Sequence, residues 1–241
     1  MNIPISINCD LGEGLDIAPQ IMPLIDAANI ACGSHAGNNE TIKTCINLAK
    51  AHQVLIGLHP GYQDRENFGR KTMKLTTLDL WDSLAAQISN FMRIAQQLDA
   101  PVHHIKLHGA LYHDVADNES LSRFFISVLK NYSNDWVIFC PPKSVLAETA
   151  ERSGYPVWKE GFLDRNYSDH GKLLSRIEAS ALITDPKLAW EHAKYILQTS
   201  KVKTVSGLEI PLEIDTLCVH GDNPKAIEIL TYLRKQYDGT I

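Results

Sequence analysis

A repeating unit of strand-like and helix-like segments limits the folds open to this chain. A short apolar or β-branched run is followed by glycine with polar residues, and then by a segment with helical periodicity. The strand-like runs lie at residues 3–8, 28–32, 54–58, 102–107, 136–140, 157–159 and 216–219. Most are near-continuously apolar, which is typical of strands buried on both faces. The alternation predicts a parallel sheet with helical crossovers.

The segments between these runs carry helix signals. Apolar residues recur with the 3.6-residue period of an amphipathic helix. Asp185-Pro186 and Asn223-Pro224 each place a capping residue before a proline that suits the first helical position. We also expect a small hairpin over residues 204–213, before the last strand. The expected helices lie at residues 39–52, 77–99, 188–197 and 226–237.

The polar residues that follow the runs favour a closed barrel over an open sheet. They stand at the carboxyl ends of at least five predicted strands, spread over the whole chain. A closed barrel gathers all strand ends around one mouth, whereas an open doubly wound sheet gathers chiefly those near its switch point. No linker, charge run or low-complexity segment marks a boundary, so we expect one α/β barrel domain over residues 1–241.

Composition excludes several classes of protein. The chain is 44% hydrophobic and 21% charged, as expected for a globular protein with a core. Its net charge of −5 argues against nucleic acid or an anionic membrane as a partner. No apolar run approaches the roughly 20 residues of a membrane span. Five scattered cysteines without a C-x-x-C pair, and a start unlike a secretory signal, favour a cytoplasmic location.

Polar segments follow the first two predicted strands. The first, Asn8-Cys9-Asp10-Leu11-Gly12-Glu13, offers two carboxylates and an amide. A carboxylate at this place could act as a general base, bind a metal or bind an amine, so Asp10 and Glu13 are candidates for these roles. The alternative is that Asn8 or Asp10 only caps a turn. In the second segment small residues flank His35, which lets another group approach it closely. A histidine in such a loop can equally serve only to bond the backbone.

A long polar loop follows the third predicted strand. It begins at His59 and contains Arg65 and Arg70, whose guanidinium groups suit a carboxylate or a phosphate. Long loops after barrel strands are commonly lids or binding loops. The alternative is that the two arginines pair with Asp64 and Glu66 and order the loop itself.

Two later strands end in further candidates. Lys106 and His108 are two residues apart in a strand and therefore point to the same side. A lysine that faces an apolar interior is costly unless it has a partner, which favours a functional role for this pair. His103 and His104 point to opposite faces, and we interpret both as structural. Asp222 follows the last strand and suits either the site or a helix cap.

Several common motifs are absent from the sequence. It contains no G-x-x-x-x-G-K-[ST], G-x-G-x-x-G or G-x-S-x-G, so no standard phosphate cradle or nucleophile elbow is present. Residues 69–72 resemble only the tail of the first motif. Cys32 near His35 suits a Cys/His nucleophile pair, but a buried structural thiol is the commoner situation.

Taken in order, the polar motifs resemble those of the LamB/YcsF family. They are N-C-D-L-G-E, N-I-A-C-G-x-H-A-G, G-x-H-P-G-Y-x-D, F-G-R, K-x-H-G-A-L-Y, D-R-x-Y and C-V-H-G-D. The resemblance implies a seven-stranded TIM-like (β/α) barrel of the glycoside hydrolase/deacetylase type. Leu107 and Leu58 stand where the family usually has proline and alanine. His170 stands where it usually has aspartate, so we assign no role to that position.

The resemblance also implies an activity. It implies an ATP-dependent 5-oxoprolinase, a hydrolase that opens the cyclic amide 5-oxo-L-proline to L-glutamate together with two partner subunits, B and C. ATP is then a co-substrate, bound mainly by the partners, and whether a metal takes part stays open. We expect Asp10 to act as base, His59 and His108 to transfer protons, and Lys106 to stabilise negative charge. The expected substrate-binding residues are Asn8, Glu13, His35, Arg65, Arg70 and Asp222, of which Arg70 suits the substrate carboxylate.

Two other classes of protein stay open. A stand-alone metal-dependent deacetylase or amidohydrolase would use Asp10, His35, His59 and His108 as a mixed ligand set. A non-catalytic sugar- or amino-acid-binding subunit would bind its ligand without turnover in any combination of partners.

Overall fold

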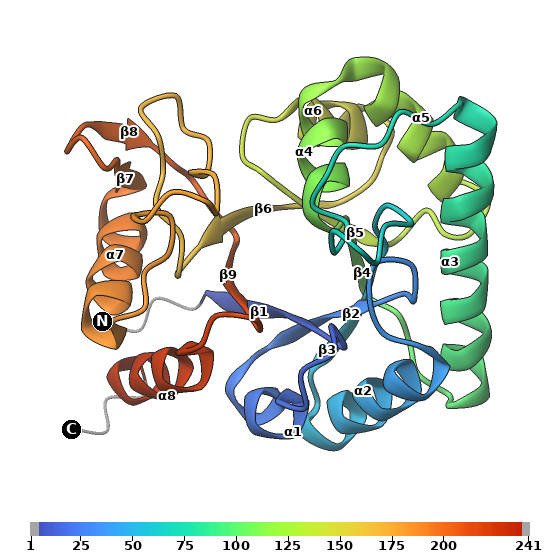
Figure 1. Cartoon of the computed structure of the whole chain (residues 1–241), viewed down its shortest axis with the longest axis horizontal. Helices are drawn as coiled ribbons and strands as arrows, with labels where there is room; N and C mark the ends of the chain where they lie inside the picture. The colour runs from blue at the N-terminus through green and yellow to red at the C-terminus, as the bar shows by residue number, and fades with distance from the viewer. Residues whose placement is uncertain (1–4, 238–241) are drawn as a thin grey trace.

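Seven parallel strands close into a barrel in the computed structural model, which describes residues 5–237 (Figure 1). β9 pairs in parallel with both β6 and β1, so Leu217 lies opposite both Gly161 and Ile7. This pairing closes the ring and confirms the predicted seven-stranded barrel. In order around the ring, the strands are β1 (Ser6–Leu11), β2 (Ala27–Ala31), β3 (Leu55–His59), β4 (His104–Lys106), β5 (Val137–Cys140), β6 (Val157–Phe162) and β9 (Thr216–His220).

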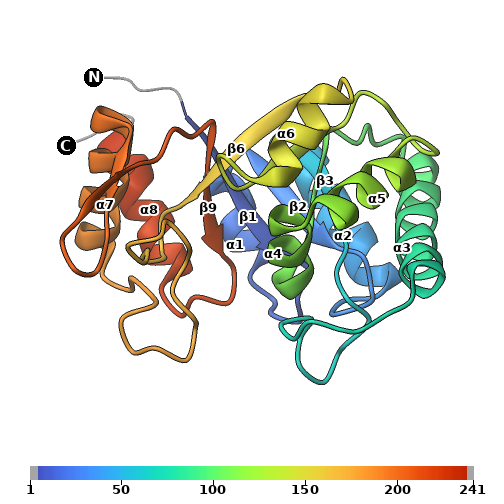
Figure 2. The same ribbon diagram turned by 90° about the horizontal axis from the view of Figure 1, so that it is seen from above.

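Helices surround the ring of strands, as Figures 1 and 2 show from two directions. All four predicted helices are present. Asp185 caps one of them by accepting the N–H groups of Lys187 and Leu188, and Pro186 is its first residue, as predicted. The helices are α1 (Ala18–Ile21), the 3-10 turn η1 (Met22–Leu24), α2 (Asn39–His52), α3 (Thr77–Gln97), α4 (Gly109–Asp117), α5 (Glu119–Leu129), α6 (Val145–Arg152), α7 (Pro186–Thr199) and α8 (Ala226–Tyr237).

The predicted hairpin is also present. β7 (Lys201–Lys203) pairs antiparallel with β8 (Glu209–Pro211), and this pair begins slightly earlier than expected. No helix within residues 5–237 combines the length and the apolar character of a membrane span.

The first strand lies further along the chain than predicted. We expected it at residues 3–8, of which Ile3 and Pro4 lie outside the described residues, and the structure has Ser6–Leu11. Asp10 therefore belongs to the strand and not to the turn that follows, and both Asn8 and Asp10 are buried inside the barrel. Hydrogen bonds inside the barrel satisfy both side chains, so polar residues that look like turn signals belong to the strand. The predicted domain includes residues 1–4 and 238–241, which also lie outside the described part.

The barrel interior has a polar floor. Asn29 Nδ2 donates to Asn8 Oδ1 at 2.8 Å, and Asn8 Nδ2 donates to Thr216 Oγ1 at 2.9 Å. His104 donates from Nε2 to Asn29 Oδ1 at 2.8 Å and stacks on Phe139 at 4.1 Å between ring centroids. The apolar core lies mainly between the barrel and its helices. This division leaves the inside of the ring free for hydrogen-bonded and charged side chains.

Gly57 provides the space that the His104 ring occupies. A Cβ atom at position 57 would lie 2.1 Å from His104 Nε2. We expect Gly57→Ala to lower the free energy of unfolding by roughly 3 kcal/mol, measured by urea denaturation, because the ring must leave its hydrogen bond. In a His104→Ser background the same change should cost much less. An equal cost in both backgrounds would contradict this steric explanation.

His192 on α7 should make folding stability depend on pH. Burial lowers the pKa of His192 to about 4, and its Nε2 donates to the Phe162 carbonyl at 3.2 Å. The unfolded chain binds this proton near pH 6.5, so the stabilisation is complete above that pH and is lost as pH falls toward 4. We expect His192→Gln to reduce the loss of unfolding free energy between pH 7 and pH 4.5 by about 2 kcal/mol. Parallel denaturation curves for both proteins at the two pH values measure this, and identical losses would refute it.

Candidate active site

The candidate active site is a cavity of about 620 Å³ at the carboxyl ends of the barrel strands. Asp10 comes from β1, His59 from β3 and Lys106 from β4, and all three line it. Helix α4 and loops after the strands add further walls, and the loops supply Arg70 and Arg176. A parallel barrel brings such distant residues together because its strands all end at the same mouth.

Lys106 is the buried cation at the base of the cavity. Its Nζ lies 2.8 Å from Asp10 Oδ1, 2.9 Å from Glu160 Oε1 and 3.0 Å from Cys218 Sγ. Burial alone would lower the pKa of Lys106, but the carboxylates outweigh it and raise this pKa well above its ordinary value. Tyr112 donates its hydroxyl hydrogen to the other Glu160 oxygen at 2.8 Å. Lys106 therefore carries its charge at neutral pH in a fixed position.

Asp10 is an ionised carboxylate held from three sides. Asn29 Nδ2 and Lys106 Nζ donate to its Oδ1, and His59 Nε2 lies 3.4 Å from its Oδ2. Burial alone would raise the pKa of Asp10, but the positive charges of His59 and Lys106 hold it well below its ordinary value. Asp10 is thus a carboxylate that can accept a proton next to a fixed cation.

Three histidines surround the carboxylate of Glu13. Its Oε1 lies 2.9 Å from His108 Nδ1, 3.2 Å from His35 Nε2 and 3.6 Å from His59 Nε2. Burial would raise the pKa of Glu13, but its contacts with His108 and His35 lower it strongly. The rings of His35 and His108 stack at 3.7 Å with planes only 2° apart. A Cβ at Gly69 would lie 3.0 Å from both His108 Cδ2 and His35 Cβ, so the glycine at position 69 leaves room for the two stacked histidines.

The structure brings six of the ten predicted site residues to the cavity wall. Asp222 lies behind that wall, where Arg70 and Arg176 both donate to its carboxylate, the latter at 2.8 Å. Arg65 donates to the carbonyls of Gly33 and Gly37, both at 2.6 Å, and so joins two loops. It does not pair with Asp64 or Glu66, which was the alternative. The residues in the wall are Asp10, Glu13, His59, Arg70, Lys106 and His108.

Asn8 and His35 also lie outside the wall. Asn8 belongs to the floor of the barrel, bonded to Thr216 and Asn29. His35 lies behind Glu13 and His108, and burial lowers its pKa to about 4. Both residues are therefore placed to orient groups in the wall and not to contact a ligand in the cavity.

Sequence reasoning assigned no role to two acidic residues of the site. Glu160 pairs with Lys106, and Asp164 accepts a hydrogen bond from His220 Nδ1 at 2.9 Å. His220 lines the cavity. The signal for Glu160 was available, because Glu160-Gly161 follows an apolar run just as the chosen candidates do.

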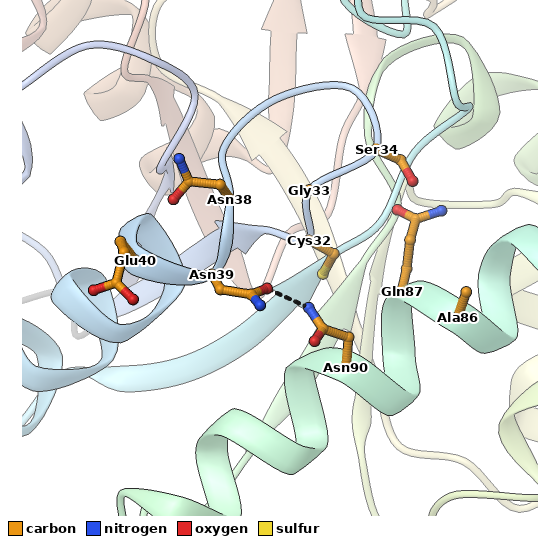
Figure 3. A pocket seen from close by; sticks show the side chains of 9 residues that line it. All are labelled: Cys32, Gly33, Ser34, Asn38, Asn39, Glu40, Ala86, Gln87 and Asn90. Atoms are coloured by element: carbon orange, nitrogen blue, oxygen red, sulfur yellow. Dashed lines mark hydrogen bonds between the residues drawn. The ribbon is translucent and has the colours of Figure 1, made fainter.

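A second hollow of about 540 Å³ lies beside the mouth, between the loop after β2 and helices α2 and α3 (Figure 3). Asn90 Nδ2 donates to Asn39 Oδ1 at 2.8 Å across it. Cys32 borders this hollow, and burial raises the pKa of its thiol to about 12. A thiol at neutral pH is a poor nucleophile, so the structural interpretation of Cys32 is the better one.

The fold and the site together define a TIM-like barrel protein. Its charged cavity lies at the carboxyl ends of the strands, where barrel enzymes have their active sites. Residues 5–240 match the LamB/YcsF family, and the chain belongs to that family. The A subunit of 5-oxoprolinase from Pyrococcus horikoshii is 35% identical over 236 residues, which are 96% of this chain and 92% of that protein. The protein of the same name from Limosilactobacillus fermentum is 35% identical over 97% of this chain and 95% of its own length.

Solved structures agree with this assignment. The lactam utilization protein of Thermus thermophilus superposes with a TM-score of 0.89 and 32% identity, over 98% of this chain and 96% of that one. A GH113 β-1,4-mannanase, at a TM-score of 0.50 and 10% identity over 95% of this chain and 98% of its own, shares the fold alone.

Proposed function

We propose that this chain is the A subunit of an ATP-dependent 5-oxoprolinase and opens 5-oxo-L-proline to L-glutamate with partner subunits B and C. The relatives from Pyrococcus and Limosilactobacillus are named as the A subunit of 5-oxoprolinase, and such a name implies a complex. The observation that carries the proposal is the buried Lys106, held between Asp10 and Glu160 at the base of the cavity. It offers a fixed positive charge beside a proton acceptor, as hydrolysis of an amide requires.

The substrate explains the need for ATP. An unstrained five-membered lactam is stabilised by resonance, and its hydrolysis is not favourable enough to proceed far without coupling. ATP transfers its terminal phosphoryl group to the amide oxygen and leaves as ADP, while the ring nitrogen gives up its proton, and the ring carbon becomes open to attack. One water then adds to that carbon, its protons pass to the nitrogen, and the C–N bond breaks to leave an acyl phosphate. A second water displaces the phosphate and yields the carboxylate of glutamate. Because the chain has no standard phosphate-binding loop, we assign ATP mainly to the partners.

Asp10 and Lys106 are the groups of this chain that act on the ring. The ionised Asp10 takes a proton from the attacking water and returns it to the ring nitrogen as the C–N bond breaks. Its low pKa favours this return. Lys106 stabilises the negative charge that develops on oxygen, and Glu160 keeps the lysine in place. Arg70 at the cavity wall is the group proposed to hold the substrate carboxylate, in competition with Asp222.

Reconstitution with the B and C subunits of the same organism tests this function. We expect glutamate formation and 5-oxoproline-dependent ATP hydrolysis only when all three subunits are present. Full activity from B and C without this chain would overturn the proposal. Turnover by this chain alone, without ATP, would identify a stand-alone amidohydrolase. Ligand binding without turnover in every combination would identify a binding subunit.

A further inference from the structure

The carboxylate of Glu13 and the nitrogens of His59 and His108 form a compact triangle at the cavity wall. We propose that these three atoms bind one divalent transition-metal ion of the zinc class. The proposal concerns binding by this chain and does not rest on the 5-oxoprolinase activity. It makes His59 and His108 ligands, in place of the proton-transfer groups expected from the sequence.

Each of the two rings uses its outer nitrogen to donate to a backbone carbonyl, so in the neutral rings the inner nitrogens carry no proton. His59 Nδ1 lies 2.9 Å from the Lys106 carbonyl, and His108 Nε2 lies 2.8 Å from the Phe68 carbonyl. A carbonyl only accepts, so each of these ring nitrogens carries the hydrogen. In the neutral rings His59 Nε2 and His108 Nδ1 then hold lone pairs. Ligating histidines usually donate their other N–H to a carbonyl or a carboxylate in this way.

Those two lone pairs face each other and a carboxylate. His59 Nε2 and His108 Nδ1 are 3.0 Å apart, and Glu13 Oε1 is 2.9 Å from the latter. Three electron-rich atoms at such distances repel unless a positive species lies among them. One extra proton can be shared by only two of these atoms at a time, whereas a metal ion can bond to all three.

The size of the triangle fits a tetrahedral ion. Zinc bonds of about 2.0–2.1 Å at tetrahedral angles place ligand atoms about 3.3 Å apart. The three edges here are 2.9, 3.0 and 3.6 Å. Two histidines and one glutamate, with a fourth position left for water, are a ligand set of catalytic zinc sites. Because Glu13, His59 and His108 line the cavity, a bound ion is reachable from it.

His35 orients this ligand set from behind. Its ring is parallel to that of His108, so no single point lies in both ring planes, and one ion cannot bond well to both. His35 donates from Nε2 to Glu13 Oε1 at 3.2 Å. Its Nδ1 is buried without a hydrogen-bond partner, as the tautomer that donates from Nε2 requires. We therefore assign His35 as a positioning residue for Glu13.

Metal titration of the full chain tests this site. Untagged protein is stripped with a chelator, exchanged into metal-free buffer at pH 7.5 and titrated with Zn²⁺ by calorimetry and with Co²⁺ by visible absorption. We expect one equivalent of either ion per chain, with the absorption of tetrahedral Co²⁺. Glu13→Gln and His108→Gln should each weaken binding at least about 100-fold, and His35→Asn by about 10- to 100-fold.

The control is His52→Gln, which removes an exposed histidine at the end of α2 and should bind metal like the wild type. Circular dichroism and the unfolding midpoint of each variant show whether its fold is intact. The wild-type titration decides by itself if a variant does not fold. Failure of the wild-type chain to bind one equivalent, or binding that is unchanged in Glu13→Gln and His108→Gln, would overturn the assignment.

Discussion

Asp10→Asn should lower glutamate formation by the reconstituted three-subunit enzyme about a thousandfold. Asparagine has the shape of aspartate and keeps an oxygen for the hydrogen bonds from Asn29 and Lys106. It cannot accept the proton of the attacking water. Lys106 retains Glu160 as its charge partner, so we expect the barrel to stay folded. The loss should appear in kcat at saturating ATP and 5-oxoproline.

The matched control is Asp82→Asn, the same change at an exposed position on α3. It should leave turnover unchanged. Circular dichroism of both variants checks that the barrel is intact. An Asp10→Asn enzyme that keeps more than a tenth of wild-type turnover would remove Asp10 from the proposed chemistry, whatever its effect on stability.

Lys106→Met should lower the free energy of unfolding by about 3–5 kcal/mol and abolish activity. Lys106 is almost completely buried, with 4% of its side chain exposed, and methionine fills a similar volume. Without the ammonium group, Asp10 and Glu160 face each other's charge in a poorly solvated interior. The penalty is the cost of two buried carboxylates that have lost their shared cation and not the loss of one attractive contact. Urea denaturation at neutral pH measures it.

Because the expected cost comes from buried negative charge, a second substitution can reduce it, and an exposed lysine provides the control. Adding Glu160→Gln to Lys106→Met removes one unpaired charge and should restore part of the stability, without restoring activity. Lys43→Met breaks the exposed pair with Glu40 on α2, where 42% of the lysine side chain is exposed. That change should cost at most about 0.5 kcal/mol. Equal costs at positions 106 and 43 would contradict the assigned role of burial.

The barrel was predictable because the same sequence pattern occurs seven times along the chain. Each unit has apolar residues in a strand and polar residues after it, so an error in the bounds of one strand does not change the predicted fold.

The ends of the strands were less predictable. Asp10 and Glu160 looked like loop residues that follow strands, but each lies inside a strand. A polar side chain inside a barrel is stable only when other strands satisfy it, and single-sequence patterns do not contain those partners.

The need for a partner at Lys106 was also predictable, but its partners were only partly so. A lysine in an apolar strand is costly unless it has a partner, and Asp10 was already a candidate for the site. Glu160 was not a candidate. It lies on β6, far in the chain from Lys106 on β4, and the two side chains meet only inside the closed ring. The loop position of Arg65 suggested substrate binding, yet the carbonyls of Gly33 and Gly37 occupy its guanidinium group.

The order of strands and helices, the closed ring and most of the charged residues of the site follow from the sequence alone, since local periodicity and strand-end chemistry are encoded residue by residue. Only the tertiary structure decided which of those residues touch. It stacked His35 on His108, turned both His59 and His108 toward Glu13, and placed Arg70 against Asp222. Side-chain direction depends on contacts between segments far apart in the chain, and barrel closure fixes all of those contacts at once.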